Sequence, residues 1–465
     1  MKKLLSLFAA LIAAGPLHAD AIDDYVNKEM AQQGTPGIAL AIVDHGELVR
    51  AQGYGFANLE HRVPVHPDTI FQSGSIGKQF TATAVMLMVE DGKLKLDESI
   101  RTYLPEAPKT WQPITVRHLL THTSGINGDP GFDLRRDYTD EQLLKILYGL
   151  KLDFPAGQRW SYSNSAYALL GLLVKRVSGE FYGDVLAKRV FGPLHMQTAR
   201  VINDRDIVMN RAAGYEIDDE GKILNQDWVA PTGNSTADGS LYLTVLDYAK
   251  WDAGLRAGRI LKPESWAEVY KPVKLTSGKT YPYGFGWSLE QFAGQEVHQH
   301  GGAWQGFLTF FIRYLGEEVS VIVLTNSNHA DPERIARGVA GLYDAKLVLP
   351  NASPIEDRNP AVTERVKRLL QQLPTQKLDA REFAKSAQQH IDRVAEYYGG
   401  RVKAVGGLQE LRLFETAERG DDQVYRYRGR FEKGILEIGA TVDPDGKFSS
   451  LTVKPETAWD SPLQP

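Results

Sequence analysis

The sequence predicts an α+β fold, because strand patterns lie at both ends of a long first domain and helical patterns lie between them. β-rich segments occur at 37–60 and again at 283–326, whereas the stretch from about 95 to 275 is dominated by helical patterns and loops. The strands do not alternate with helices, as they would in a parallel α/β protein. We therefore expect one antiparallel sheet built from both ends of the domain, flanked by helices and by an inserted helical region.

The first residues have the pattern of an export signal. Lys2 and Lys3 precede an apolar run at 4–14, and the small-residue context of Ala19 fits cleavage after it. We expect residues 1–19 to be removed as a signal peptide, which gives a periplasmic or secreted protein. The apolar run is shorter than the roughly 20 residues needed to span a bilayer, and no other run approaches that length, so we expect no membrane span.

Composition excludes several classes of protein. The sequence has 465 residues, no cysteine and a formal net charge of −5. Without cysteine there are no disulfides, no thiolate nucleophile and no cysteine-ligated zinc. The mildly acidic balance gives no indication of nucleic-acid binding. The length suits a large domain with its own core, followed by a smaller domain.

The elements of the first domain follow from local patterns. A short helix is expected at about 22–33, and two strand patterns flank His45-Gly46, which supplies the turn of a β-hairpin. The segment that begins at Ser73 is predicted to be a helix, because apolar residues continue at helical spacing to Val89. The later patterns are helical at 114–126, 140–150 and 165–179, strand-like at 283–289, 297–300, 306–315 and 319–326, and helical again at 331–348.

A second, smaller domain is predicted at the C-terminal end. Residues 349–360 have the proline, asparagine and charge content of a linker, which places the large domain at 20–348. Residues 361–465 begin with helical patterns and continue as strands, and Asp445-Gly446 marks one hairpin turn. This order predicts a small α+β domain. It contains no reactive group of residues, and the sequence does not indicate its function.

Ser75 and Lys78 form the most informative motif of the chain. They lie three residues apart, so on a helix the serine hydroxyl and the lysine amine share one face. A serine hydroxyl becomes an effective nucleophile when a neighbour removes its proton, and a desolvated lysine is one such neighbour. The unpaired N–H groups of a first helical turn also suit a developing oxyanion. The alternative interpretation is an N-cap serine followed by a surface lysine.

A second motif, Tyr162-Ser163-Asn164, precedes a predicted helix. A tyrosine beside a lysine ionises more easily, because the positive charge favours the phenolate, and a phenolate can accept the serine proton. The amide of Asn164 can orient both the lysine and a substrate carbonyl. The alternatives are a packed aromatic residue whose hydroxyl finds a partner, for Tyr162, and a helix N-cap, for Asn164.

A third motif ends a predicted strand with His300, Gly301 and Gly302, followed by Ala303 and Trp304. Glycines at a strand edge let a ligand approach the backbone closely, and the next N–H can serve as a second oxyanion donor. We expect Trp304, beside that donor, to form a wall of the substrate site. The alternative interpretation is a simple glycine-rich turn.

In this order and context, the three segments resemble the penicillin-recognising serine hydrolases of the β-lactamase-related family. The closest branch comprises class C β-lactamases, D-Ala-D-Ala carboxypeptidases and family VIII-type esterases. The resemblance covers about residues 22–348 and extends to FQSGSIGKQFTA, ITVRHLLTHTSGI, FPAGQRWSYSNSAYALLG and YGFGW. It implies a β-lactamase/transpeptidase-like fold and hydrolysis of a small-molecule ester, peptide or β-lactam through an acyl-enzyme, with no cofactor and no metal.

The resemblance also implies a role for each residue. Ser75 is the acyl-accepting nucleophile and Lys78 assists removal of its proton. Tyr162 is the general base for acylation and then the acid for the leaving group, although the assignment of the base in related enzymes is disputed. The remaining positions contact the substrate or its oxyanion, namely Asn164, His300, Gly302 and the backbone N–H groups of Ser75 and Ala303.

One departure from the family pattern narrows the expected substrates. Class C β-lactamases have lysine at the start of the third motif, whereas this chain has His300, as carboxypeptidase, D-aminopeptidase and esterase members do. A permanent positive charge for a drug carboxylate is therefore missing. We expect a hydrolase of esters, or of amides and peptides ending in D-amino acids. The alternatives are a class C-type β-lactamase and a non-catalytic penicillin- or peptidoglycan-binding sensor.

Histidine pairs elsewhere do not indicate a metal site. His118 and His122 are four residues apart, and His298 precedes His300 by two, but no H-E-x-x-H pattern accompanies either pair. We expect structural hydrogen bonds at His118, His122 and His298. The sequence leaves the acyl donor and the oligomeric state open.

Overall fold

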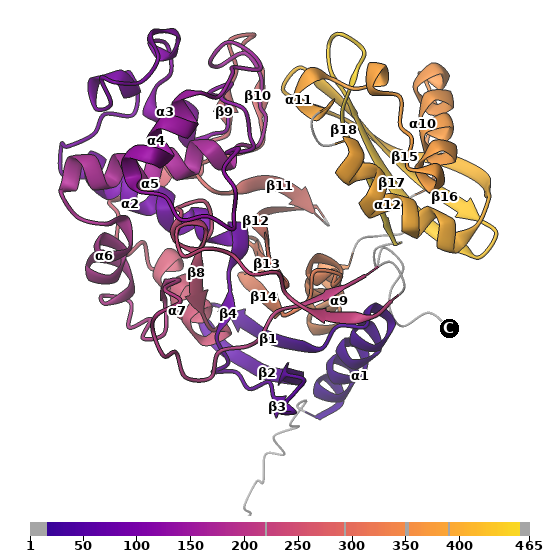
Figure 1. Cartoon of the computed structure of the whole chain (residues 1–465). Coiled ribbons are helices and arrows are strands. Elements are labelled where there is room, and N and C mark those ends of the chain that lie inside the picture. Colours follow the sequence, from indigo (N-terminus) through magenta and orange to yellow (C-terminus); the bar gives the residue numbers. More distant parts are fainter. Residues whose placement is uncertain (1–15, 219–220, 293, 349–352, 389–390, 456–465) are drawn as a thin grey trace, which may run out of the picture.

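The computed structural model describes residues 16–218, 221–292, 294–348, 353–388 and 391–455. They form a large domain, from α1 (Pro16–Gln33) to α9 (Pro332–Tyr343), and a C-terminal domain, from α10 (Pro360–Gln372) to β18 (Phe448–Pro455) (Figure 1). Most of the expected signal peptide lies outside the described residues. Among the described helices, none combines the length and apolar character needed to cross a membrane.

A seven-stranded antiparallel sheet, with the strand order β11-β12-β13-β14-β1-β2-β3, organises the large domain. β1 (Gly37–Asp44) lies between β2 (Glu47–Asn58) and β14 (Val319–Thr325), so strands from both ends of the domain are hydrogen-bonded neighbours, as predicted. The turn residues His45 and Gly46 both have positive φ, which a two-residue hairpin turn of type I′ requires. The other strands are β3 (Val63–Pro64), β11 (Ser288–Phe292), β12 (Gln295–Trp304) and β13 (Phe307–Tyr314).

Helices pack on both faces of this sheet. Along β1, Ile38, Leu40 and Ile42 belong to one hydrophobic cluster with α1 and α9, whereas Ala39 and Ala41 belong to the cluster on the opposite face. The alternation follows from the two-residue period of a strand. The alanines leave room for α7 (Val245–Arg256), which contacts both β1 and β14.

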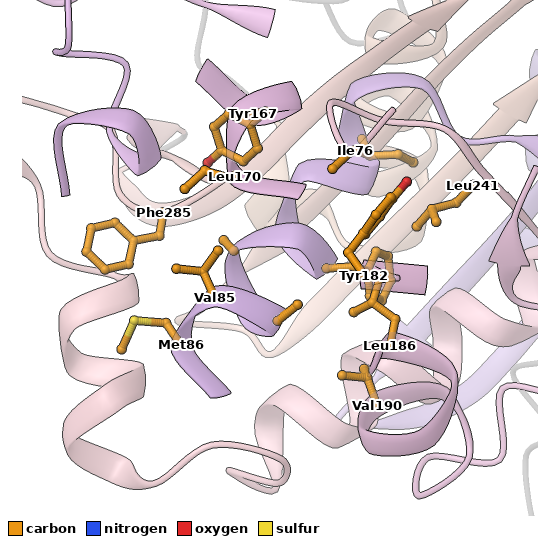
Figure 2. Close-up of a cluster of buried hydrophobic side chains, with 14 of the residues drawn as sticks. Ile76, Val85, Met86, Tyr167, Leu170, Tyr182, Leu186, Val190, Leu241 and Phe285 are labelled. Carbon is orange, nitrogen blue, oxygen red and sulfur yellow. The ribbon is translucent and has the colours of Figure 1, made fainter. Parts of the chain in front are cut away.

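Helix α2 (Lys78–Glu90) runs through the centre of the inserted helical region. Every side chain from Lys78 to Met88 is buried, which is typical of a helix covered on all sides. It contacts α5 (Asn164–Ser178) and α6 (Tyr182–Leu186). Figure 2 shows part of this core, in which Val85 and Met86 of α2 lie among side chains from α5, α6 and the segment near Phe285. The start of α2 is therefore fixed by packing along its length.

The other elements of the large domain are short. One expected strand, 283–289, is wrong in its first part, because β11 begins at Ser288. Residues before it bend at Gly286, which has a positive φ and packs against the start of α2. The remaining elements are β4 (Phe71–Gln72), α3 (Val116–Leu120), α4 (Asp140–Tyr148), β5 (Arg200–Val201), β6 (Tyr215–Ile217), β7 (Ile223–Asn225), β8 (Leu241–Leu243), α8 (Pro263–Val269), β9 (Val273–Lys274) and β10 (Thr280–Tyr281).

The C-terminal domain has the predicted order of helices followed by strands. Its four-stranded sheet joins consecutive strands as an antiparallel meander, and its helices cover one face over a separate hydrophobic core that includes Leu369, Tyr427 and Ile438. Its elements after α10 are α11 (Lys385–Gln388), α12 (Ile391–Val405), β15 (Leu408–Arg419), β16 (Asp422–Phe431), β17 (Gly434–Val442) and β18.

The two domains are joined by ion pairs as well as by the chain. Arg159 pairs with Asp443 at 2.9 Å and with Asp445 at 2.7 Å. Lys454 of β18 pairs with Glu333 of α9 at 2.7 Å. The C-terminal domain thus lies beside β10 and β11 of the large domain, as Figure 1 shows. This arrangement brings it to the mouth of the candidate active site.

Candidate active site

Ser75 lies in a short 3₁₀ helix, Gly74–Gly77, which continues directly into α2. The preceding Ser73 is fully buried and anchors this turn on two sides. Its Oγ donates a hydrogen bond to the Gly239 carbonyl at 2.7 Å, and its own carbonyl accepts one from Thr309 Oγ1 at 2.6 Å. The candidate nucleophile is therefore held between the inserted helical region and strand β13.

Lys78 is the first residue of α2, and its side chain is completely buried. Its Nζ donates hydrogen bonds to Ser75 Oγ at 3.1 Å, to Asn164 Oδ1 at 2.8 Å and to the backbone carbonyl of Asp238. Burial disfavours the ammonium and lowers the pKa of Lys78 from 10.5 to about 8, although the nearby charge of Asp238 opposes this shift. A neutral amine, which could take the serine proton, is therefore accessible near neutral pH.

Tyr162 lies beside this lysine, with Lys78 Nζ 4.8 Å from the ring centroid. Its buried hydroxyl has no hydrogen-bond partner of good geometry within the described part of the chain. The Ser75 side chain lies close to this hydroxyl and acts to lower the pKa of Tyr162. Burial dominates and raises the pKa of Tyr162 well above its ordinary value of 10. The expectation that the lysine makes Tyr162 ionise more easily is therefore wrong, because the cost of desolvating a phenolate is larger. Tyr162 is a neutral hydroxyl at neutral pH.

Asn164 is the first residue of α5, and its amide oxygen is directed at Lys78. The helix is capped by the preceding residue instead, since Ser163 Oγ accepts a hydrogen bond from the N–H of Ala166 at 3.1 Å. The alternative interpretation of Asn164 as an N-cap is therefore wrong. The Tyr-Ser-Asn motif places three adjacent residues in three different positions, beside the lysine, at the helix cap and in contact with the lysine amine.

His300 is buried on β12 at one end of a chain of hydrogen bonds. The N–H of Ser163 donates to His122 Nδ1 at 3.0 Å, which places the His122 proton on Nε2, 3.2 Å from Tyr283 Oη. Tyr283 Oη lies 2.9 Å from His300 Nε2, and His300 Nδ1 lies 2.6 Å from the Gly301 carbonyl. Burial lowers the pKa of His300 to about 4, so the ring is neutral at pH 7 and donates from Nδ1.

The remaining histidines lie apart. Helix α3 ends at Leu120 and His122 has a positive φ, so His118 and His122 do not share a helix face. His118 belongs to the capping box of α3 with Thr115, and His298 Nε2 lies 3.3 Å from Glu296. Within the described residues, no group of three or more histidine, aspartate or glutamate side chains is placed to hold a metal ion.

Backbone N–H groups of Ser75 and Ala303 are brought together by glycines. A Cβ placed on Gly74 would clash with the backbone nitrogen of Ala303, and one placed on Gly302 would clash with the Ser73 carbonyl and lie 3.0 Å from Ser75 N. Gly239 closes the third side, since a Cβ there would lie 2.9 Å from Ser75 N. This close approach fits the expected pair of oxyanion donors.

A cavity of about 790 Å³ opens beside Tyr162 and Asn164. Tyr162, Asn164, Asp238 and Trp304 line it from the large domain. Trp304 is held there by a hydrogen bond from its Nε1 to Asn234 Oδ1 at 2.8 Å. The opposite wall comes from the C-terminal domain and consists of Phe383, Ser386, Ala387, Ile391, Val394, Arg419, Asp422, Thr441, Ser449, Ser450 and Leu451. The candidate substrate site is thus shared by the two domains.

Sequence reasoning identified Ser75, Lys78 and Asn164, which the structure brings together, but it missed several neighbours. Asp238, whose carbonyl accepts from Lys78, lies in a small-residue turn that carries no recognisable motif. Tyr283 is the first residue of the segment YGFGW, which indicated only the family resemblance and part of an expected strand. No local signal marks the C-terminal wall of the cavity, because it depends on how the domains pack.

The fold and this site define a serine hydrolase. A buried lysine bonded to a serine at a helix start, with two backbone N–H groups beside that serine, is suited to acyl transfer. The model of the family described as Beta-lactamase matches residues 22–345, and the chain belongs to this family. The resemblance to the penicillin-recognising serine hydrolases, and the α+β fold that it implied, are thereby confirmed.

Two curated relatives are similar over much of the large domain. A penicillin-binding protein of Bacillus subtilis (strain 168) is 29% identical over 308 residues, which are 62% of this chain and 68% of the relative. A D-aminopeptidase of Gluconobacter oxydans (strain 621H) is 26% identical over 325 residues, which are 68% of this chain and 59% of the relative. The chain therefore matches about three fifths of that D-aminopeptidase.

Two solved structures have similar folds. The D-amino acid amidase from Ochrobactrum anthropi SV3, complexed with L-phenylalanine amide, has a TM-score of 0.62 and 26% identity, covering 71% of this chain and 97% of that one. The octameric penicillin-binding protein homologue from Pyrococcus abyssi has a TM-score of 0.62 and 23% identity, covering 94% of this chain and 98% of that one. The second likeness concerns the fold alone.

Proposed function

We propose that this serine hydrolase cleaves amides, short peptides or esters of D-amino acids through an acyl-enzyme on Ser75. The observation that carries the proposal is the hydrogen bond between buried Lys78 Nζ and Ser75 Oγ, beside a neutral His300. Relatives named D-aminopeptidase and D-amino acid amidase support amides of D-amino acids as the substrate class.

Acylation begins with attack of Ser75 Oγ on the substrate carbonyl carbon. The neutral amine of Lys78 accepts the hydroxyl proton across the 3.1 Å contact. The carbonyl oxygen becomes an oxyanion and is stabilised by the N–H groups of Ser75 and Ala303. When the tetrahedral intermediate collapses, the bond to the leaving amine or alcohol breaks. Lys78 returns the proton to the leaving group through the Tyr162 hydroxyl, which gives one proton and receives another.

Deacylation repeats these steps with water in place of the serine. A water molecule attacks the ester carbonyl of the acyl-enzyme, the same base removes its proton, and the Ser75 oxygen leaves as the hydroxyl. Asn164 holds Lys78 Nζ at 2.8 Å throughout and keeps the amine directed at the serine. Deacylation releases the same carboxylic acid from every substrate with the same acyl group. Amides, peptides and esters therefore differ only in acylation, where the leaving amine or alcohol departs.

Efficient turnover of β-lactam drugs is the less favoured function. Burial holds the pKa of His300 at about 4, so this position carries no charge near pH 7. A drug carboxylate would therefore lack the cation that a lysine supplies there in class C β-lactamases. Slow acylation by penicillins remains compatible with the same nucleophile.

The proposal is tested by comparing the purified protein with a Ser75→Ala variant on D- and L-phenylalaninamide and on p-nitrophenyl acetate. We expect the wild type to release ammonia from the D-amide, and we expect the Ser75→Ala variant to release none. Hydrolysis of the ester alone would instead favour an esterase. The non-catalytic alternative would be supported if benzylpenicillin formed a lasting adduct, by intact mass, while no substrate was turned over.

We also propose that the protein is exported and acts in the periplasm or outside the cell. The basic start and apolar run before Ala19 support this location. The test is the N-terminal sequence of protein recovered from the periplasmic or culture fraction. A chain that retained Met1 and stayed with the cytoplasmic fraction would contradict the proposal.

A further inference from the structure

The wall that the C-terminal domain contributes to the active-site cavity carries an acidic side chain, Asp422. This residue is the first of β16 and follows the turn residues Gly420 and Asp421. The turn is fastened to the large domain, because the N–H of Gly420 donates a hydrogen bond to the Thr280 carbonyl at 2.9 Å. Asp422 is therefore held in place at the cavity by contacts between the domains.

The cavity is acidic overall. Among its described lining residues, Asp129, Asp238 and Asp422 are aspartates, whereas Arg419 is the single basic side chain. Arg419 is already paired with Glu290 at 3.1 Å. A cavity with excess negative charge attracts cations and disfavours anions such as the carboxylate of a penicillin.

Two of these carboxylates, Asp422 and Asp238, have acceptor capacity that the described residues leave unused. Asp422 Oδ2 accepts a hydrogen bond from Ser449 Oγ at 2.8 Å, but Asp422 forms no ion pair with any described residue. Asp238 is only 9% exposed, and its Oδ1 has no hydrogen-bond partner among the described residues. An unpaired buried acceptor is costly unless a ligand supplies the donor.

Burial also affects the ionisation of Asp422. It raises the pKa of the Asp422 carboxyl to about 6, and the neighbouring Asp443 adds to this shift. At pH 7 the group is still mostly ionised. Asp443 and Asp445 on the same domain both form ion pairs with Arg159, whose charge also lowers the pKa of Asp422 and so opposes part of this shift.

We propose that Asp422 binds the free ammonium group of the substrate, and that the C-terminal domain thereby selects substrates with an unblocked amino terminus. This inference rests on the proposed function and narrows its substrate class to D-amino acid amides and peptides with a free α-amino group. On the opposite wall, the charge of Asp238 acts on the neighbouring Lys78. Asp422 acts in recognition and takes no part in proton transfer at Ser75.

The test measures binding without turnover, using the whole chain with Ser75→Ala. Calorimetry at pH 7 gives the Kd of D-phenylalaninamide, whose α-amino group is mostly protonated at that pH, and of its N-acetyl derivative, which is neutral. We expect Asp422→Asn to weaken binding of the cationic amide by about tenfold to a hundredfold, and to leave the acetylated amide unchanged, because a charged hydrogen bond is lost. Asp421→Asn is the matched control, since it removes the same charge from the same turn but Asp421 does not line the cavity.

Equal losses for both amides, or no loss in Asp422→Asn, would overturn the proposal, as would failure of the Ser75→Ala protein to bind the cationic amide. The activity comparison in the presence of Ser75 separates this inference from the proposed function. If Asp422→Asn does not change the turnover of D-phenylalaninamide, the ammonium site is contradicted and the proposed hydrolase function stands. If binding is charge-selective but no substrate is turned over, the ammonium site stands and the proposed hydrolase function is contradicted.

Discussion

Asn164 Oδ1 accepts a hydrogen bond of 2.8 Å from Lys78 Nζ, which joins the first residue of α5 to the first residue of α2. The amine is thereby held inside the buried contact between these two helices. Burial lowers the pKa of Lys78 to about 8, which allows a lysine to act as a base near neutral pH.

The first prediction concerns the charge at Asn164. In Asn164→Asp, a carboxylate facing Lys78 Nζ favours the ammonium, so the pKa of Lys78 rises above about 8. The rising limb of kcat/KM against pH should move to higher pH. Each unit by which the lysine pKa rises should lower kcat/KM at pH 7 about tenfold. Asn164→Ala is the control, because loss of the amide acceptor should move the limb to lower pH. Identical profiles in the two variants would contradict this account.

The second prediction concerns the wild-type pH profile. Lys78 must be neutral to accept the Ser75 proton, so the active form is lost as pH falls below the lysine pKa of about 8. kcat/KM should therefore rise about tenfold per pH unit up to that value and level off above it. The measurement is initial-rate kinetics from pH 6 to 10 with a substrate that does not titrate in that range. A midpoint near the ordinary lysine pKa would show that burial does not tune this group.

Much of the large domain could be predicted from its sequence because the patterns are local. The hairpin around His45-Gly46 and the strands at 306–315 and 319–326 follow from alternation, β-branched residues and turn chemistry. The motif positions also indicated that Ser75 and Lys78 would meet, because three residues make about one helical turn.

Other features could not be predicted, because they depend on burial and on packing between distant segments. The high pKa of Tyr162 results from desolvation by residues far away in sequence, which outweighs the neighbouring lysine. Tyr283 has a role only because it lies between His122 and His300 in space. The carboxylate of Asp422 reaches the cavity through docking of a domain that carries no motif of its own.

The third prediction concerns the hydrogen-bond chain through Tyr283. Its hydroxyl lies between His122 Nε2 and His300 Nε2, at 3.2 Å and 2.9 Å. Tyr283→Phe leaves two buried imidazole nitrogens without a partner, so the free energy of unfolding should fall by about 1–3 kcal/mol. Tyr248→Phe is the matched control, since the Tyr248 hydroxyl is buried without a described partner and its removal should be neutral or stabilising. Urea unfolding gives the free energy of unfolding of both variants. Equal destabilisation in the two variants would contradict the stabilising role of the hydrogen bonds of Tyr283 with His122 and His300.

The last prediction concerns the approach of β12 to Ser75. A methyl group on Gly302 would overlap the Ser73 carbonyl and the Thr309 hydroxyl, both of which belong to the anchoring bonds of the nucleophile turn. Gly302→Ala must therefore push β12 away from the turn and separate the N–H groups of Ser75 and Ala303. Since an oxyanion donor is typically worth about 10²–10³ in rate, kcat should fall at least a hundredfold.

Gly301→Ala provides the control on the adjacent residue. Its added Cβ would meet only ordinary contacts, the nearest being Phe310 Cδ2 at 3.6 Å, so the variant should keep kcat within a few-fold of the wild type. Both variants carry the same methyl group on the same strand, so their difference reports the spacing between β12 and the Ser75 turn. Steady-state kinetics with p-nitrophenyl acetate, together with thermal unfolding, separates a loss of chemistry from a loss of fold. If both variants lost activity equally, strand flexibility rather than the oxyanion geometry would explain the glycines.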